Sequence, residues 1–428
     1  MPSSSSRGLL LLAVLTHLLS APEVTGAKEK PEPAQAHPEH PEEPACQHLI
    51  SHLADLFFSL FRETAQSSKG SNVMLSPLSL TAALAMLLAG SRGDSHTQIL
   101  QSLELHLTET KETMIQACFQ HLLQTFQHAQ GQLTAGSFLF VDHSVTPRNA
   151  FLDDIQQLSH PEAITINLND TPGAKMQINA FLRRESRNEI RDLVEDLENG
   201  TTLALVAYAS FHGNLQDEFH TENMVEENFF VNKKTTLRVP TINRLGAFDL
   251  HRDTSLSSRV LVQHYMGDTV AFFVLPDQEK MEQLERGMTK EQFNNLLRSS
   301  GDIRPASLYL PRFSISGTYH LKPLLGKLGI TKVFSNEADF SGITEQAPLK
   351  LSQAVHRAVL TTEEQVVNTE KMVSLEEDEA LITESMYPED VWSPQPISKF
   401  NSPFLVILKD DNTNFPIFLG KVVNPTQP

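Results

Sequence analysis

The sequence LKLSQAVHRAVLT at residues 349–361 and the sequence FNSPFLVIL at residues 400–408 are both apolar and strand-like, and they enclose a long acidic segment. That segment, residues 362–399, holds ten Asp and Glu residues against two lysines, Lys371 and Lys399, together with three prolines. Loops longer than about 12–15 residues are uncommon in compact domains and are usually functional or disordered. We therefore expect an exposed loop that the fold presents to a partner.

Length and composition indicate a large globular protein. The chain has 428 residues, of which 40% are hydrophobic and 20% are charged, and this balance suits a full core. The formal net charge is -18, and the acidic loop contributes eight of these charges because ten acidic residues stand against two lysines there. A net charge of this sign argues against binding to nucleic acid or to an anionic membrane surface.

The N-terminus has the pattern of a secretory signal peptide, because Arg7 precedes an apolar run over residues 8–19 and small residues follow. The run is shorter than the ~20 residues that a membrane span needs, so we expect a soluble, secreted, extracellular protein. Retention in the endoplasmic reticulum is the alternative, although the C-terminus carries no retention signal. The expected segments are a signal peptide at residues 1–27 with cleavage between residues 20 and 27, a disordered Pro- and Glu-rich arm at 28–45, and one folded domain at 46–428.

Two cysteines and a glycosylation sequon bear on the secreted state. Secretion permits a disulfide between Cys46 and Cys118, but their spacing does not say whether they are close, so their pairing stays open. Asn199 begins the sequence Asn-Gly-Thr, and the turn-forming residues around it favour an exposed loop that accepts a glycan. A second sequon at Asn169 is weaker because Pro172 follows it directly.

Helical patterns dominate the first half of the chain and strand patterns dominate the second half. Ser76 and Pro77 form a helix start, and the apolar run at residues 80–88 predicts a central, buried helix. Other helices are predicted at residues 49–61, 94–103, 110–129, 147–159, 173–185, 188–197, 279–299 and 319–328. Strands are predicted at residues 137–141, 203–211, 227–231, 235–239, 259–265, 269–275, 306–315, 404–409 and 415–422. No linker separates the halves, so we expect a single α+β domain.

Motifs of catalysis and metal binding are absent from the sequence. It contains no nucleophile elbow (G-x-S-x-G), no H-E-x-x-H, and neither of the glycine-rich nucleotide-binding patterns. His37 and His40 lie in the arm that we expect to be disordered, where solvated polar residues are a simpler interpretation than a metal site. We therefore expect a protein that is not an enzyme and that needs no cofactor or metal.

Several short motifs together resemble the serpin family over residues 46–428. They are SPLS at 76–79, FHG at 211–213, LPRFSI at 310–315, LGI at 328–330, ADFSGI at 338–343, HRAV at 356–359 and FNSPF at 400–404. The ending GKVVNPTQ at 420–427 is similar to that of the alpha-1-antitrypsin group. The resemblance implies a fold of three β-sheets and about nine helices, with residues 362–399 as an exposed reactive-centre loop. We also expect a monomer whose partner is a serine protease.

The resemblance also implies a mode of action. In inhibitory serpins a serine protease cleaves the loop as a substrate, and the freed segment inserts as a new strand into the main sheet and carries the acyl-enzyme with it. Alignment backward from the second apolar stretch places the cleaved bond at Trp392–Ser393, and Trp suits the large apolar pocket of a chymotrypsin-like protease. Alignment forward from Glu364, whose expected ion partner is Arg312, places the bond near Ala380. Both positions stay open, and their difference indicates an insertion in the loop.

The first part of the loop departs from the pattern of inhibitory serpins, which carry small residues there. The hinge here contains Val366, Val367, Thr369 and Lys371. Alternate residues of a strand face the core, and counting from Val367 turns Lys371 inward, where an unpaired ammonium costs several kcal/mol. A run of four carboxylates follows at residues 376–379. The alternative to an inhibitor is therefore a non-inhibitory serpin that is a carrier, chaperone-like or vestigial.

The resemblance also implies a network of polar side chains beneath the main sheet. In relatives, the equivalents of Ser76, Ser79 and His356 share this network with an asparagine, whose position is Ala207 here. His356 is then expected to be a buried histidine with fewer hydrogen-bond partners.

Overall fold

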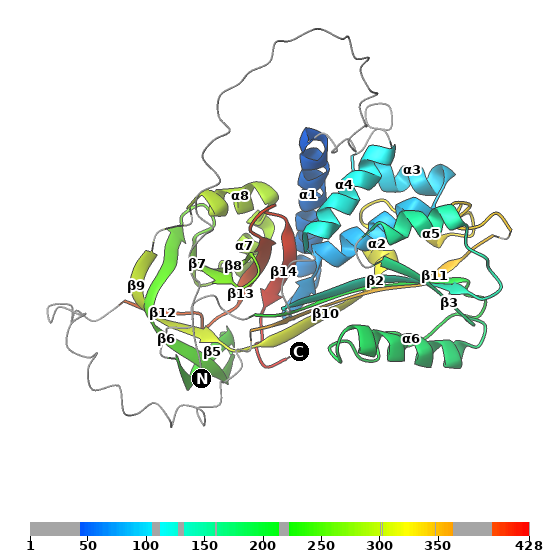
Figure 1. The fold of residues 1–428 in the computed structure, drawn as a ribbon. Helices are drawn as coiled ribbons and strands as arrows, with labels where there is room; N and C mark the ends of the chain where they lie inside the picture. Colours follow the sequence, from blue (N-terminus) through cyan, green and yellow to red (C-terminus); the bar gives the residue numbers. More distant parts are fainter. Residues whose placement is uncertain are drawn as a thin grey trace, which may run out of the picture. The chain divides into compact units, whose positions relative to one another are not determined.

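The computed structural model describes residues 43–104, 112–126, 132–158, 161–213, 222–299, 301, 303–346, 348–362 and 396–427. The chain divides into two units, Met1–His40 and Pro41–Pro428, and all described residues belong to the second. That unit consists of two β-sheets with helices packed against them (Figure 1). This is the α+β class that the sequence predicts.

A five-stranded sheet contains the main candidate site. Its strands, in spatial order, are β10 (Ser314–His320), β11 (Leu351–Thr361), β4 (Leu203–His212), β2 (Leu133–Asp142) and β3 (Pro161–Ile166). β11 and β4 pair in parallel, from Leu351 opposite Leu203 to Thr361 opposite His212. On their outer sides, β10 pairs antiparallel with β11 and β2 pairs antiparallel with β4. A parallel pair from two distant parts of the chain therefore lies inside this sheet.

The second sheet has nine strands. Their order is β1 (Val73–Leu75), β14 (Pro416–Val422), β13 (Phe404–Asp410), β8 (Thr269–Pro276), β7 (Ser258–Tyr265), β6 (Thr235–Asp253), β9 (Ile303–Pro311) and β12 (Ile397–Lys399), with β5 (Glu222–Asn232) also paired to β6. β6 is 19 residues long and pairs with β5, β9 and β7 in succession. The family resemblance implies a second and a third sheet. Here β6 pairs with β5 and β9 along its first part and with β7 along its last part, so hydrogen bonds join these strands into one sheet.

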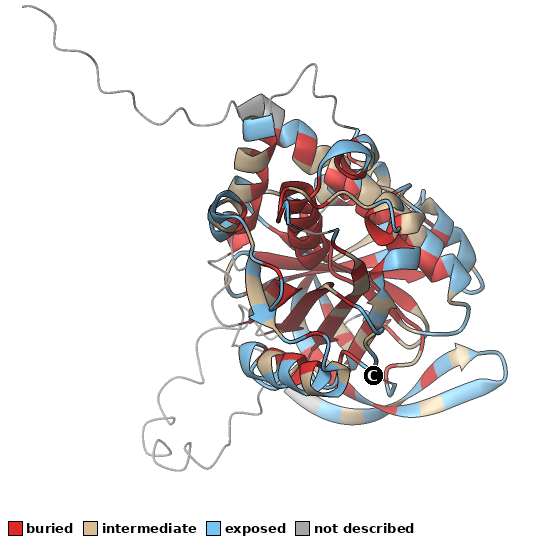
Figure 2. Ribbon diagram, turned by 90° about the vertical axis from the view of Figure 1, so that its right-hand side faces the viewer, coloured by how far each residue is buried: buried red, intermediate tan, exposed pale blue. Residues whose placement is uncertain are grey.

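The described part of the chain has nine α-helices: α1 (Glu43–Ser67), α2 (Pro77–Gly90), α3 (Gly93–Ser102), α4 (Glu112–Thr125), α5 (Asn149–Gln156), α6 (Thr171–Glu185), α7 (Met281–Gly287), α8 (Lys290–Ser299) and α9 (Leu321–Gly326). Every residue of α2 is buried, and this helix contacts β2, β4 and β14. Figure 2 shows how the buried residues gather on the strands and on the inner helices. The side chain of Ser76 accepts a hydrogen bond from the N–H of Ser79 at the start of α2, where Pro77 suits the first turn. The predicted central helix is confirmed.

Helix α6 covers the opposite face of the five-stranded sheet (Figure 1). The helix and the segment after it pack against β2, β4 and β11 in a second apolar cluster, which includes Phe138, Phe140, Ile178, Leu182, Ile190, Leu193, Val194, Val206, Tyr208, Val355 and Val359. The helix predicted at residues 188–197 is wrong. Asn188 and Asp192 have φ angles of 72° and 48°, in the left-handed region that a right-handed helix excludes. Asn179 also bonds to both backbone groups of Val194, so a side chain of α6 satisfies backbone groups of this irregular segment.

Two further predicted elements are divided in the structure. The strand predicted at residues 306–315 is wrong as a single element, because β9 ends at Pro311, β10 begins at Ser314, and the two belong to different sheets. The helix predicted at residues 279–299 is two helices, α7 and α8. A third difference concerns β1, which was not predicted. It has three residues, and a strand this short cannot show the alternating pattern by which strands are predicted.

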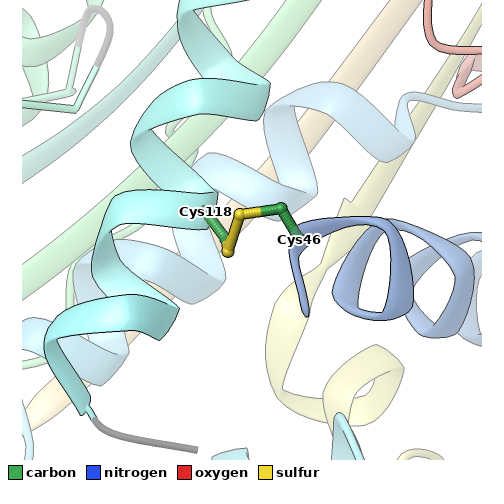
Figure 3. Close-up of a disulfide and its surroundings, with 2 residues drawn as sticks. All are labelled: Cys46 and Cys118. Carbon is green, nitrogen blue, oxygen red and sulfur yellow. A yellow bond between two sulfur atoms is a disulfide. The ribbon is translucent and has the colours of Figure 1, made fainter. Parts of the chain in front are cut away.

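Cys46 and Cys118 form a disulfide (Figure 3). Cys46 lies near the beginning of α1, Cys118 lies on α4, and both residues are buried. The two cysteines are 72 positions apart in the sequence, and this spacing alone did not show that they pair. The bond fixes the beginning of α1 to α4.

Candidate functional site

The candidate functional site lies inside the five-stranded sheet, where β11 meets the beginning of α2. His356 of β11 is opposite Ala207 of β4 and is fully buried. The backbone N–H of Ser76 donates to Nε2 of His356 over 3.1 Å, and Nδ1 of His356 lies 3.3 Å from Oγ of Ser79. Because Nε2 accepts a hydrogen bond, the proton of the neutral ring resides on Nδ1.

Burial controls the charge of this histidine. Loss of water around the ring lowers the pKa of His356 to about 3, and a hydrogen bond with the backbone of Ala207 only partly offsets that effect. The ring is therefore neutral at physiological pH. Tyr319 of β10 stacks on it with the ring centroids 6.3 Å apart, and burial raises the pKa of Tyr319 to about 12. The site is a neutral, hydrogen-bonded cluster.

The structure brings together the three residues that the sequence predicts for this network, Ser76, Ser79 and His356. It adds Ser137 of β2, whose Oγ donates to the carbonyl of Ser79 over 3.1 Å. It also adds Tyr319, whose hydroxyl accepts a backbone hydrogen bond from β1 over 3.4 Å. Sequence reasoning missed both residues, because only the register of β2 and β10 places them beside α2 and β11.

The acidic loop begins at the end of β11. The N–H of Thr362 donates to the carbonyl of Phe313 over 3.0 Å, and the N–H of Phe313 donates to Oγ1 of Thr362 over 3.1 Å. On the other side, the N–H of Gly213, just beyond β4, donates to the carbonyl of Thr361 over 3.1 Å. The chain is therefore held on both sides up to Thr362.

Arg312 lies beside this loop base, next to Phe313 in the chain, and is half-buried. Its expected ion partner, Glu364, lies outside the described residues, so that ion pair stays a prediction. The other loop residues singled out from the sequence lie outside the described residues as well: Val366, Val367, Thr369, Lys371, Ala380, Trp392 and Ser393.

The far end of the loop is anchored in the nine-stranded sheet. β12 pairs in parallel with β9, and Nζ of Lys399 lies 2.8 Å from Oε1 of Glu227 on β5. The same ammonium lies 4.4 Å from the ring centroid of Tyr309. Phe400 is buried and donates its N–H to the carbonyl of Tyr309 over 2.9 Å. Residues 363–395 therefore connect the end of β11 with an edge strand of the other sheet.

Asn199 lies in an exposed turn. The next residue, Gly200, has a φ of 77°, a backbone conformation that glycine adopts without strain. Thr201 is buried, and its hydroxyl donates to the carbonyl of Glu198 over 2.6 Å. The residue that would carry the glycan is therefore at the surface, as the sequence predicts.

Within the described ranges, no three or more His, Cys, Asp and Glu side chains are grouped so that they could hold a metal ion. Among the same residues, no helix combines the length and the apolar character that crossing a membrane requires. Both cysteines are joined in the disulfide, so neither thiol is available as a ligand.

Comparison with known proteins agrees with this arrangement. The family model described as serpin (serine protease inhibitor) matches residues 51–425. Alpha-1-antitrypsin-related protein of Homo sapiens is 47% identical over 433 residues, and alpha-1-antitrypsin of Sus scrofa is 45% identical over 434 residues, with 100% of each chain covered in both cases. The crystal structure of human thyroxine-binding globulin with bound thyroxine has a TM-score of 0.76 and 30% identity, covering 89% of this chain and 99% of that chain. The chain therefore belongs to the serpin family.

We predict that His356 makes the fold less stable in acid. Its native pKa is about 3, whereas an unfolded histidine has a pKa of about 6.5, so between these values the unfolded chain binds a proton that the native chain does not. The free energy of unfolding should therefore decrease as the pH falls from about 6.5 towards about 3. Urea unfolding at several pH values measures this decrease.

Carboxylates also titrate in the lower part of this pH range and change the stability of the parent protein. The contribution of His356 is therefore isolated by comparing the parent with His356→Gln, which keeps a hydrogen-bonding side chain without an ionisable ring. The difference in unfolding free energy between the parent and this variant should shrink as the pH falls from about 6.5. A difference that stays constant between about pH 6.5 and pH 4.5 would contradict the assignment.

Proposed function

We propose that this protein is a secreted inhibitor of serine proteases. In this proposal a protease cleaves the loop at residues 362–399 as a substrate, and the freed segment inserts between β11 and β4. Membership of a family described as serine protease inhibitors supports it, as does the high identity to a relative named alpha-1-antitrypsin.

The position of the loop is the observation on which the proposal depends. The loop leaves the sheet at Thr362, directly after β11, whose neighbour β4 runs parallel to it. A segment that turned back at this point would run antiparallel to both strands. One parallel ladder would then be replaced by two antiparallel ladders, which are slightly more stable per residue. Backbone groups of the inserted segment would form hydrogen bonds with both β11 and β4, and together these gains favour insertion.

We infer a chymotrypsin-like protease as the partner. Trp392, on the acyl side of the Trp392–Ser393 bond, would fill the large apolar pocket of such an enzyme. The aromatic ring would bury a large apolar surface there. A monomer suffices for this scheme, because the chain supplies both the loop and the sheet that receives it.

A non-inhibitory serpin is the second candidate function. Lys371 and the carboxylate run at residues 376–379 oppose insertion, and an acyl-enzyme that is not displaced in time is hydrolysed. The loop would then be only a substrate. Since the structural neighbour thyroxine-binding globulin was solved with thyroxine bound, a carrier of small molecules is one form of this alternative.

Incubation of the purified protein with chymotrypsin distinguishes the two functions. An inhibitor should form an SDS-stable complex, and its cleaved form should melt at a higher temperature because insertion adds a strand. Trp392→Ala should slow complex formation at least about tenfold, since it removes an aromatic side chain from the specificity pocket. Tyr387→Ala is the matched control, because Pro388 makes the bond after Tyr387 a poor substrate and its loss should change the rate little.

Complex formation would exclude the non-inhibitory function. Cleavage with neither a complex nor a rise in melting temperature would exclude inhibition by insertion. A complex that forms equally fast with Trp392→Ala would instead place the reactive bond elsewhere, with Ala380 as the next position to map by sequencing the released peptide.

Lys371→Ala should increase the fraction of cleavage events that end in a complex. Insertion would bury this ammonium without a charge partner, and removing it removes a cost of several kcal/mol. Glu370→Ala is the control, because the neighbouring residue faces the opposite side of an inserted strand. Gel densitometry at a fixed ratio of protein to protease measures the partition. An unchanged partition in Lys371→Ala would show that this lysine does not limit insertion.

We further propose that the chain is secreted with a glycan on Asn199, because the predicted signal peptide would bring this exposed turn to the glycosylation machinery. Expression in mammalian cells should release the protein into the medium, and enzymatic removal of N-glycans should lower its mass. That decrease should be lost in Asn199→Gln. Retention inside the cell argues against secretion, and an unchanged decrease in the variant argues against this glycan site.

A further inference from the structure

The outer surface of α1 carries two histidines one helical turn apart. His48 and His52 occupy positions i and i+4, which lie on the same face of a helix. Their Nε2 atoms are 3.1 Å apart, and their ring centroids are 4.2 Å apart. His48 is exposed, and the side chain of His52 retains 24% of its exposure. Two ring nitrogens therefore approach each other at a place that solvent can reach.

Glu104 fixes the second of these rings. It follows α3, and its Oε2 lies 3.0 Å from Nδ1 of His52. A carboxylate that accepts from one ring nitrogen keeps the proton on that nitrogen and leaves a lone pair on the other. Nε2 of His52 is then the basic nitrogen, and it is the one that faces His48. Metal-ligating histidines commonly have a carboxylate or carbonyl in this second position.

The spacing of the two nitrogens fits one metal ion. Zn–N bonds are about 2.0–2.1 Å long, so two nitrogens at a tetrahedral angle around one ion lie about 3.3 Å apart, and two at a right angle lie about 2.9 Å apart. The observed distance of 3.1 Å falls between these values. Water would fill the remaining coordination positions of the ion.

We propose that His48 and His52 bind one Zn²⁺ ion through their Nε2 atoms, with Glu104 orienting the ring of His52. Imidazole nitrogen suits Zn²⁺, and it also suits Cu²⁺ and Ni²⁺. The open coordination makes this a weaker site than a closed structural site with four protein ligands. The positive end of the helix dipole opposes a cation only within the first turn, and α1 begins at Glu43, more than one turn before His48.

Calorimetric titration of the full secreted chain with Zn²⁺ near neutral pH tests the proposal. We expect one site per chain, with affinity weakened at least about tenfold in His48→Ala and in His52→Ala. Glu104→Ala should weaken binding by about tenfold, as expected for loss of a carboxylate that orients a ligand. His121→Ala, which removes an exposed histidine of α4, is the matched control and should bind like the parent.

A further variant separates this site from other histidines. The double variant His37→Ala with His40→Ala should keep full affinity, because those residues belong to the N-terminal arm. Circular dichroism without metal shows that each variant is folded. The absence of a one-to-one site in the parent, or an affinity unchanged in both His48→Ala and His52→Ala, would overturn the proposal.

Discussion

The parallel pairing of β11 with β4 is the constraint on which the rest of the structure depends. The strands come from distant parts of the chain, and a hairpin cannot close a parallel pair. On one face, α2 and the polar cluster around His356 cover the pair; on the other face, α6 and the segment after it cover it. The acidic loop leaves from the end of β11. The same pair therefore organises both layers of the sheet and is the pair that the proposed insertion would separate.

Hydrogen bonds at this pair are unequally distributed between the two strands. His356 of β11 is bonded to Ser76 and Ser79 at the beginning of α2, whereas β4 contributes only the backbone of Ala207 at that level. The face under α6 is held by apolar contacts. Movement of β4 away from β11 would break the backbone ladder and the apolar packing, but it would leave the bonds between His356 and α2 intact. A side chain with its own hydrogen bonds at position 207 would oppose that movement more strongly.

Local sequence patterns predicted helices and strands well where residues close together in the sequence determine the structure. The cap at Ser76, the apolar run of α2 and the strand that contains His356 are of this kind. Patterns failed where residues distant in the sequence determine the structure. Asn179 bonds to the backbone of Val194 within the irregular segment 188–197, and strand register determines which residues surround the buried histidine. The pair His48 and His52 has the i, i+4 spacing of a helix surface, but its carboxylate partner, Glu104, lies in the turn after α3, so the sequence alone did not indicate a site.

The buried face of β11 also determines which residue of the loop would contribute most to the free-energy cost of the proposed insertion. Opposite residues of an antiparallel pair share a face, so an inward Lys371 would oppose an inward residue such as His356. The polar groups there are serine hydroxyls and an imidazole that is neutral because its pKa is about 3; they accept hydrogen bonds but carry no negative charge to offset desolvation of an ammonium. β11 is 11 residues long, so an inserted strand of equal length starting at Val366 would end at Glu376. Most of the carboxylate run would then lie beyond the strand, and Lys371 would contribute more than the acidic run to the free energy of insertion.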